Sequence, residues 1–476
     1  MKDVYVNPLC ERYASKQMQQ IFSPDKKFST FRALWVALAE AEKELGLDIT
    51  DEQIAEMKAH VFDIDYEKAA AYESALRHDV MAHIKTFADA CPLAAPIIHL
   101  GATSCFVGDN TDILVMKEAL ERVKTLVIGV IRALYDFAGK NAEVYCLAYT
   151  HFQAAQPTTY GKRATLWLND FISDLKNIDF VLDNMALLGC KGTTGTGASF
   201  KQLFDGDYQK VKLLEEKIAN KMGVKKCQPV SGQTYSRKVD YTVLSVLSGI
   251  AQSAAKLSSD LRLASHLKEF DEPFEKAQVG SSAMAYKRNP MRSERIASLS
   301  RLVIANAANP AFTAASQWLE RTLDDSANRR VAIPEAFLAT DGILNLVINV
   351  VSGGTVYPLV CKSHLDEELP FMATENILMY CVKKGGDRQA LHERIRLHSV
   401  ETAKAMKETG ERNDLLDKIL SDPAFNLTKE ELDTIVCAKN FSGFAVEQTK
   451  EYLETVVKPI IDLYADFSGE FGQINV

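Results

Sequence analysis

The sequence lacks the long apolar runs and the basic excess that mark membrane proteins and nucleic-acid-binding proteins. Its longest apolar stretches, such as residues 126–130 and 343–351, are short or carry polar breaks, whereas a membrane span needs about 20 apolar residues. The formal net charge of the chain is −8, which argues against nucleic acid or an anionic membrane as the main partner. Any site for an anionic ligand must therefore be built locally.

Cysteine pairs with metal-binding spacing are missing as well. The nine cysteines are scattered, none forms a CxxC pair, and Cys361 with His364 has no second pair to complete a zinc site. We therefore expect no metal and no cofactor. The odd number of cysteines, and an opening segment without the pattern of a secretory signal, predict reduced thiols and a cytoplasmic protein.

Long amphipathic helices dominate the middle of the chain. Apolar residues recur in steps of three and four from Val239 to Leu261, with no proline between them, which predicts one helix of roughly 30 residues. Similar stripes cover residues 113–137, after the capping-type run 109–111, and residues 164–188. Alternating patterns are brief, so we expect few strands beyond small hairpins. The pattern predicts an all-α fold built on a helical bundle.

Three domains are expected from the chain length and from changes in pattern. Irregular segments at 190–199 and 270–289 interrupt the bundle pattern, while the boundaries are expected near Ser104 and Gly354. The expected division is an N-terminal helical domain at 1–104, a central long-helix bundle at 105–356 with a loop at 270–294, and a C-terminal helical domain at 357–476.

The most informative segment is residues 280–294, GSSAMAYKRNPMRSE. Two serines follow a glycine, and Lys287 and Arg288 precede Asn289-Pro290, which predicts a helix start with Asn289 as the N-cap. A cationic loop that leads into a helix N-terminus suits a polyanionic substrate. An ordinary surface loop has the same composition, so the motif alone leaves both interpretations open.

A second candidate is His151, in the segment Thr-His-Phe-Gln before Pro157 and a long helix. Histidine titrates near neutral pH and can serve as a general acid or base. A lone histidine is more often structural, however, and its place beside a helix start does not decide between the two roles.

Two charged segments also allow two interpretations. Residues 318–330 carry three arginines and Ser326, which could bind carboxylate or phosphate, although Asp324 and Asp325 could instead neutralise the arginines. Residues 77–79 read Arg-His-Asp. If they lie on a helix, their side chains diverge, which favours a solvated helix face over an ion cluster.

The glycine-rich stretch 189–197 does not fit a nucleotide-binding loop. It lacks both the Gly-Lys-Ser or Gly-Lys-Thr ending and the GxGxxG pattern, and it follows a predicted helix where a strand is required. It is therefore either a turn that contacts substrate or a plain connector.

Taken together, several segments resemble the adenylosuccinate lyases in their animal-type form, within the fumarase, aspartase and argininosuccinate lyase superfamily. The matching segments are 76–83, 98–105, 150–153, 191–196, 232–235, 280–294 and 320–330. The resemblance implies a three-domain, all-α lyase that forms a homotetramer, with three subunits contributing to each active site. It also implies small purine nucleotide substrates and reversible β-elimination of fumarate, from adenylosuccinate to give AMP and from the succinylcarboxamide ribotide SAICAR to give AICAR.

The resemblance also implies catalytic roles. Removing a proton beside a carboxylate requires a base, fixed positive charge and an acid for the departing nitrogen. Ser281 would be the base, Lys287 and Asn289 would stabilise the developing charge, and His151 would be the acid, oriented by Glu294. Loop amides and Lys287 are candidates for activating Ser281.

Substrate-binding residues follow from the same matching segments. The phosphate and ribose side is assigned to Arg12, Tyr13, Arg295, Arg321, Ser326 and Arg330, with Arg77, His78 and Asp79 nearby. The succinyl carboxylates are assigned to Thr103, Ser104 and Gln233.

One departure and two rival interpretations accompany the resemblance. Ala285 stands where the family has proline, so we expect the open loop to be more disordered and its closure to cost more entropy.

Argininosuccinate lyase or fumarase activity is the nearest rival, but the segments at 98–105, 191–196 and 320–330 favour a purine substrate. A non-catalytic protein such as a lens crystallin is the other rival, and the presence of the five residues assigned to catalysis argues against it.

Overall fold

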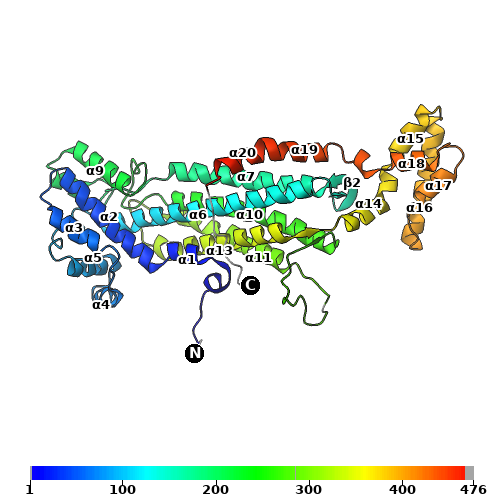
Figure 1. Cartoon of the computed structure of the whole chain (residues 1–476). Coiled ribbons are helices and arrows are strands. Elements are labelled where there is room, and N and C mark those ends of the chain that lie inside the picture. Colours follow the sequence, from blue (N-terminus) through cyan, green and yellow to red (C-terminus); the bar gives the residue numbers. More distant parts are fainter. Residues whose placement is uncertain (1–2, 285, 467–476) are drawn as a thin grey trace.

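The computed structural model describes residues 3–284 and 286–466, and it has an elongated, helical shape (Figure 1). Long helices run side by side through the centre, short helices gather at one end, and a small helical cluster extends from the other end. In the described ranges, strands form only two short antiparallel pairs. The all-α prediction is confirmed.

The N-terminal part consists of short helices around one longer helix, with local start signals that explain their positions. The elements are η1 (Leu9–Tyr13), α1 (Lys16–Ile21), α2 (Pro24–Glu44), α3 (Asp51–Ala59), α4 (Tyr66–Leu76) and α5 (Asp79–Ala90). The Ser23 hydroxyl caps α2, which has Pro24 in its first turn. Thr50 and Gln53 form a capping box at the start of α3.

Six helices make up the central bundle. They are α6 (Ser104–Lys140), α7 (Tyr160–Asn184), α10 (Lys238–His266), α11 (Met291–Asn306), α12 (Ala308–Ser316) and α13 (Asp325–Gly353). The pairs α6 with α7, α10 with α11 and α11 with α13 pack closely. By length and composition α13 could cross a membrane, but 83% of its most apolar window is buried inside the protein. This helix is therefore the core of the bundle.

The long helices predicted from periodicity are present, but two of their ends differ from expectation. The first begins at Ser104, so the run 109–111 lies inside α6 and does not cap it. The polar side chains in this run serve tertiary contacts: Asn110 donates to the carbonyl oxygen of Gly189, and Asp109 pairs with Arg237. The second helix, α7, ends at Asn184, four residues before the end of its apolar stripe.

The irregular segments and strands connect the bundle helices. The strands are β1 (Tyr145–Thr150), β2 (Gln153–Thr159), β3 (Phe270–Asp271) and β4 (Thr355–Val356). β1 and β2 form a hairpin, and β3 pairs with β4 across a long stretch of sequence. The short helices α8 (Ala198–Leu203) and α9 (Tyr208–Lys221) follow the glycine-rich stretch. The prediction of few strands is confirmed.

The hydrophobic core has two parts. One cluster runs from the N-terminal helices through the bundle and includes Leu453 and Val457, while a smaller one occupies residues 373–435. The C-terminal elements are α14 (Pro358–Met372), α15 (Thr374–Lys383), α16 (Arg388–Glu408), α17 (Leu415–Ser421), α18 (Lys429–Ile435), η2 (Ala438–Asn440), α19 (Ala445–Tyr452), η3 (Leu453–Val457) and α20 (Lys458–Leu463). The chain leaves the bundle through α14 and returns along α7 and α6 (Figure 1). The three-domain division stays a prediction.

Candidate functional site

A cavity of about 590 Å³ lies where α4, α5, α6 and the start of α13 meet. Its walls include polar and charged side chains from segments far apart in the sequence. Seven of the predicted binding residues line it: Arg77, His78, Asp79, Ser104, Arg321, Ser326 and Arg330. The fold therefore brings these residues together, while their roles stay predictions.

Residues 77–79 reach this cavity because they form the break between two helices. Arg77 ends α4 in the left-handed conformation, with φ of 55°, and His78 is the N-cap of α5. The expectation that these side chains diverge along one helix is wrong, because the chain turns between them. Arg330 Nη2 lies 3.4 Å from Asp79 Oδ2, which ties this break to α13.

The hydrogen bonds of His78 define its neutral tautomer. Its Nδ1 accepts the backbone N–H of Met81 at 3.2 Å, so a neutral ring carries its proton on Nε2. Nε2 lies 3.3 Å from the hydroxyl of Ser104 and can donate to it. His78 thus links the start of α5 to the start of α6 at the cavity wall.

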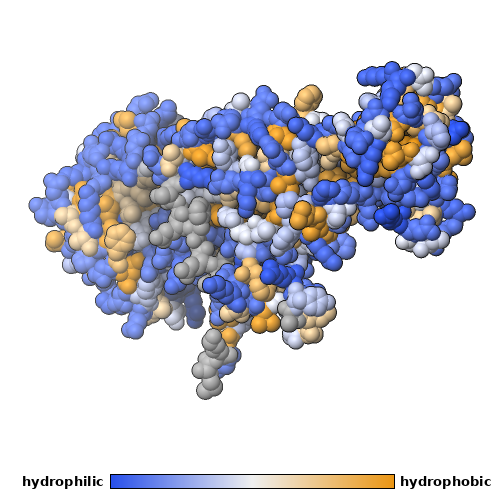
Figure 2. Space-filling model, turned by 45° about the vertical axis from the view of Figure 1, so that its right-hand side comes forward, coloured by the Kyte–Doolittle hydropathy of each residue, from blue (hydrophilic) through white to orange (hydrophobic). Residues whose placement is uncertain are grey.

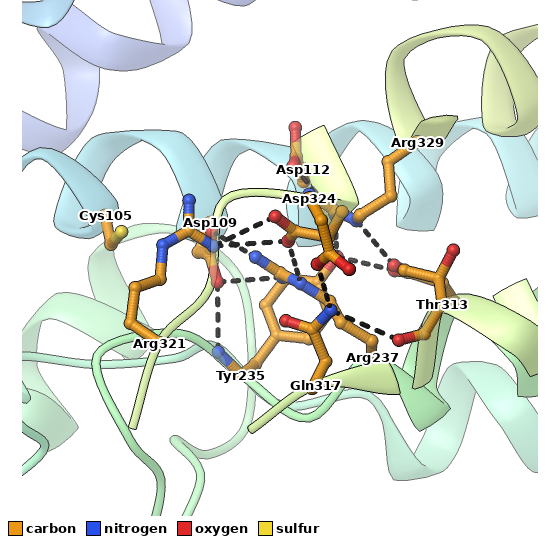
Figure 3. Close-up of polar contacts among 12 residues, drawn as sticks. Cys105, Asp109, Asp112, Tyr235, Arg237, Thr313, Gln317, Arg321, Asp324 and Arg329 are labelled. Carbon is orange, nitrogen blue, oxygen red and sulfur yellow. Dashed lines mark hydrogen bonds and ion pairs between the residues drawn. The ribbon is translucent and has the colours of Figure 1, made fainter. Parts of the chain in front are cut away.

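A network of charged side chains lines the cavity, and Figure 3 shows the polar contacts within it. Arg237 lies between two carboxylates, with Nη1 3.0 Å from Asp109 Oδ2 and Nε 2.6 Å from Asp325 Oδ2. Burial raises the pKa of Asp109, and Arg237 opposes that effect. Burial alone would lower the pKa of Arg237, but Asp109 reverses this and raises it. The network holds α6, α10 and α13 together at the site.

The three arginines of residues 318–330 have different environments. Arg329 is buried and pairs with Asp240 at 2.6 Å and Asp112 at 2.9 Å, and it also donates to the Tyr235 hydroxyl. Arg321 pairs with Asp325 at 3.2 Å and still lines the cavity. The side chain of Arg330 is 66% exposed. Neutralisation by Asp325 therefore applies to Arg321, whereas Arg329 is neutralised by Asp240 and Asp112 instead. The exposed side chain of Arg330 is open to a ligand.

Sequence reasoning missed Asp109, Asp112 and Arg237 as part of the site. A signal was present, because Asp109 and Asp112 lie three positions apart directly before the apolar stripe 113–137. Side chains at that spacing share one helix face, which indicates a buried polar partner. Asp109 pairs with Arg237, 128 residues along the chain, and Asp112 pairs with Arg329, 217 residues along the chain, so no local signal identifies either partner.

Glycines allow three segments to pack closely beside the cavity. A Cβ on Gly195 would lie 1.9 Å from the carbonyl oxygen of Ser231, and one on Gly232 would lie 2.5 Å from that of Glu320. The backbone N–H of Gln233 donates to Glu320 at 3.0 Å, and its side-chain oxygen lies 3.6 Å from Cys105 Sγ. Thr103 is the N-cap of α6. This packing places Gln233 beside the start of α6, where Cys105 lines the cavity.

The predicted catalytic loop crosses over itself near its base. A Cβ on Gly280 would lie 2.2 Å from the Lys287 carbonyl oxygen, and Asn289 Nδ2 donates to the Gly280 carbonyl at 3.0 Å. Asn289 therefore does not cap the following helix, and the N-cap prediction is wrong: α11 begins at Met291, with Pro290 as the N-cap residue. The Ser281 hydroxyl accepts the amides of Ala283 and Met284 at 3.3 and 3.1 Å. Ala285 lies outside the described residues.

The remaining predicted residues lie elsewhere in the chain. His151 and Phe152, with φ of 52° and 58°, form the exposed tip of the β1–β2 hairpin. The expectation of a histidine beside a helix start is therefore wrong, because β2 separates His151 from α7. Glu294 lines a second cavity of about 480 Å³ with Arg288, Arg12 and Tyr13 belong to η1, and Arg295 follows in α11.

The described part of one chain does not assemble the whole predicted site. Within it, no hydrogen bond or ion pair joins His151 to Ser281, Lys287 or Glu294. Among the described residues, no group of three or more His, Cys, Asp or Glu side chains is placed to hold a metal ion.

The comparisons with known proteins agree along the whole chain. A lyase family model matches residues 4–305, and a model of the adenylosuccinate lyase C-terminus matches residues 370–452. An adenylosuccinate lyase of Saccharomyces cerevisiae is 49% identical over 100% of this chain and 99% of its own length. The chain belongs to the adenylosuccinate lyase family. An adenylosuccinate lyase of Schistosoma mansoni is 48% identical, over 97% of each chain.

The fold agrees with membership of the adenylosuccinate lyase family and its superfamily. A fumarate lyase structure from Mesorhizobium sp. BNC1 superposes with a TM-score of 0.79, covering 95% of this chain and 100% of that chain at 21% identity. At that identity the likeness concerns the fold alone. The resemblance to the adenylosuccinate lyases is confirmed, and this family member is a lyase.

Proposed function

We propose that this chain catalyses the elimination of fumarate from adenylosuccinate to give AMP, and from SAICAR to give AICAR, in purine nucleotide biosynthesis. The cavity carries the proposal, because Arg330, Ser326 and His78 open onto one space in a protein of net charge −8. Arg side chains bind phosphate and carboxylate through paired N–H donors. The names of the relatives, adenylosuccinate lyases from a yeast and a flatworm, support the same substrate.

The loop supplies the base in the proposed mechanism. Two backbone amides donate to the Ser281 hydroxyl oxygen, and donors to an oxygen favour its ionised form. Ser281 would remove the proton beside the succinyl carboxylate, and Lys287 with Asn289 would stabilise the negative charge that develops. His151 would protonate the departing nitrogen, with Glu294 orienting its ring. In this proposed mechanism, side chains of the protein carry out both proton transfers, and no metal or cofactor is assigned a role.

The substrate would be held by the cavity and the segments around it. Arg12, Tyr13, Arg295, Arg321, Ser326 and Arg330 would bind the phosphate and ribose, with Arg77, His78 and Asp79 nearby, and Thr103, Ser104 and Gln233 would bind the succinyl carboxylates. Binding groups would thus come from η1, α11, the segments beside the starts of α5, α6 and α10, and residues 321–330. The reacting groups would come from the hairpin, the loop and the start of α11.

A homotetramer with shared active sites would unite these groups. His151 lies at a hairpin tip, whereas the cavity lies at the junction of α4, α5, α6 and α13. Within one chain, His151 and the residues that line the cavity therefore belong to different elements. Apolar patches interrupt the hydrophilic surface of the face seen in Figure 2, and Leu302, Ile304, Phe312 and Val331 of α11 to α13 are exposed. Exposed apolar surface on bundle helices supports association with further copies.

A cytoplasmic location is proposed from the cysteines. All nine are free in the structure, and five of them are buried. Free thiols in this number suit a reducing compartment.

An ultraviolet assay of the purified protein with adenylosuccinate, argininosuccinate and malate in parallel tests the activity. We expect turnover of adenylosuccinate alone, and no change with adenylosuccinate would sink the proposal. Ser281→Ala and His151→Ala should each lower kcat by about 100-fold or more. Sharing of active sites between subunits predicts a further result. Mixing the two inactive variants under conditions that exchange subunits should restore part of the activity. If each site lay within one chain, mixing would restore none.

A further inference from the structure

The helix that follows the catalytic loop receives its cap from the opposite end of that loop. α11 begins after Pro290, which provides no side-chain cap, and Asn289 is turned toward Gly280. Instead, Glu272 Oε2 accepts the backbone N–H of Arg292 at 3.0 Å. Its Oε1 accepts both the backbone N–H and the hydroxyl of Ser293, each at 2.6 Å.

These contacts suit a carboxylate for electrostatic reasons. The first N–H groups of a helix have no partner within the helix, and the helix dipole makes that end partially positive. Hydrogen bonds to an ionised acceptor are shorter and stronger than those between neutral groups. Both oxygens of Glu272 are used, so a neutral amide in the same place would direct an NH₂ group at one of the donors.

The same contacts close the loop at its base. Glu272 immediately precedes residues 273–291, which include Ser281, Lys287 and Asn289, and its partners immediately follow them. Arg292 carries the connection into the bundle, since its Nη1 lies 2.6 Å from Asn349 Oδ1 on α13. Its Nη2 also pairs with Glu275 at 3.3 Å, but the Glu275 side chain is 72% exposed.

We propose that Glu272 is a positioning residue, which fixes the two ends of the catalytic loop so that Ser281 and Lys287 return to the same place at each turnover. The inference rests on the proposed function, since it assigns those residues to the reacting end of the substrate. The cavity that would hold the phosphate and ribose is built from other elements. Loss of Glu272 should therefore slow the reaction step more than it weakens substrate binding.

The test compares Glu272→Gln with Glu275→Gln, which removes the same charge from an exposed position in the same loop. We expect Glu272→Gln to lower kcat by at least 10-fold and to change KM by less than 2-fold, whereas Glu275→Gln should leave both within 2-fold of wild type. Trypsin should cut the loop at Lys276, Lys287 or Arg288 at least 5-fold faster in Glu272→Gln. A Glu272→Gln protein with wild-type kcat and wild-type cleavage would overturn the proposal, as would an equal loss in the control.

A second variant distinguishes a loss of loop positioning from a folding defect. Ser293→Ala removes one of the three hydrogen bonds to Glu272 and keeps the two amide contacts, so we expect wild-type helical content by circular dichroism and an intermediate loss of kcat. Wild-type kcat in a folded Ser293→Ala protein, together with an unfolded Glu272→Gln protein, would assign Glu272 to folding and overturn the proposal. If wild type does not turn over adenylosuccinate, the proposed function fails, while the cleavage rates still decide whether Glu272 orders the loop.

Discussion

Asp109 Oδ2 lies 3.0 Å from Nη1 of Arg237, and these two buried residues line the same cavity as the candidate binding residues. This pair joins α6 to the start of α10, and Asp325 on the other side of Arg237 adds α13. Because a buried ion pair recovers its desolvation cost only when every charge has a partner, the three residues depend on one another.

Replacing Arg237 with Met should therefore destabilise the protein strongly. The change leaves Asp109 and Asp325 without their shared cation, and breaking a buried pair in this way costs about 3–5 kcal/mol. The melting temperature and the urea midpoint measure the loss. Lys450→Met breaks an exposed pair with Glu143 and serves as the control, with no expected change. Equal melting temperatures for both variants would contradict a structural role for the network.

Glu42 should make stability fall as pH rises. This fully buried side chain of α2 has no hydrogen-bond partner for either oxygen, and burial raises its pKa from 4.5 to about 8. The folded state therefore keeps a proton that the unfolded state releases above pH 4.5, so stability is highest below that pH and declines up to about pH 8. Glu42→Gln should gain in melting temperature over wild type at pH 8.5, and gain little at pH 5.

Glu44 on the same helix is the control for that experiment. Hydrogen bonds from Lys217 and Lys221 lower its pKa to about 2. Its charge therefore contributes stability above pH 4.5 and loses it only as the pH falls toward 2. The effect of Glu44→Gln should be the same at pH 5 and pH 8.5. If the melting-temperature difference between Glu42→Gln and wild type were also the same at pH 5 and pH 8.5, the assignment of a protonated Glu42 would be refuted.

Substitutions of the adjacent residues Arg329 and Arg330 should have different effects, the first on protein stability and the second on substrate binding. Arg329→Met removes a buried cation shared by Asp240 and Asp112 and should lower the melting temperature. Arg330→Met changes an exposed side chain that lines the cavity, so we expect a KM for adenylosuccinate raised by about 10-fold or more and an unchanged melting temperature. Steady-state kinetics and thermal unfolding of both variants check this. A wild-type KM for Arg330→Met would exclude it from substrate binding.

Ala285→Pro should reduce the mobility of the loop without abolishing activity. Proline fixes φ near −65° and allows a chain segment fewer conformations than alanine does, which lowers the entropy that the segment loses when it is ordered. Slower tryptic cleavage at Lys287 and Arg288, with kcat within a few-fold of wild type, is the expected result. An inactive variant with wild-type helical content would show that the family proline does not suit this chain.

Local patterns in the sequence were sufficient to predict the long helices and to recognise the motifs in their order along the chain. The steps of three and four from Val239 predicted α10 almost to its ends, because helix periodicity is set by neighbours within one or two turns. The same local reasoning failed at residues 109–111 and at Asn289. Both have the composition of a cap, but Asp109 bonds to Arg237, 128 residues away, and Asn289 bonds to the Gly280 carbonyl oxygen, nine residues back in the same loop.

The sequence by itself determined an all-α lyase of the adenylosuccinate type, since amphipathic stripes and ordered motifs are properties of residues close together in the chain. Only the tertiary structure decided which arginine is buried, how residues 77–79 meet, and which side chain caps α11. Arg329 pairs with a residue 89 positions away and Arg330 with one 251 positions away. A charge is neutralised by whatever the fold places within about 4 Å of it, and separation along the sequence does not specify that distance.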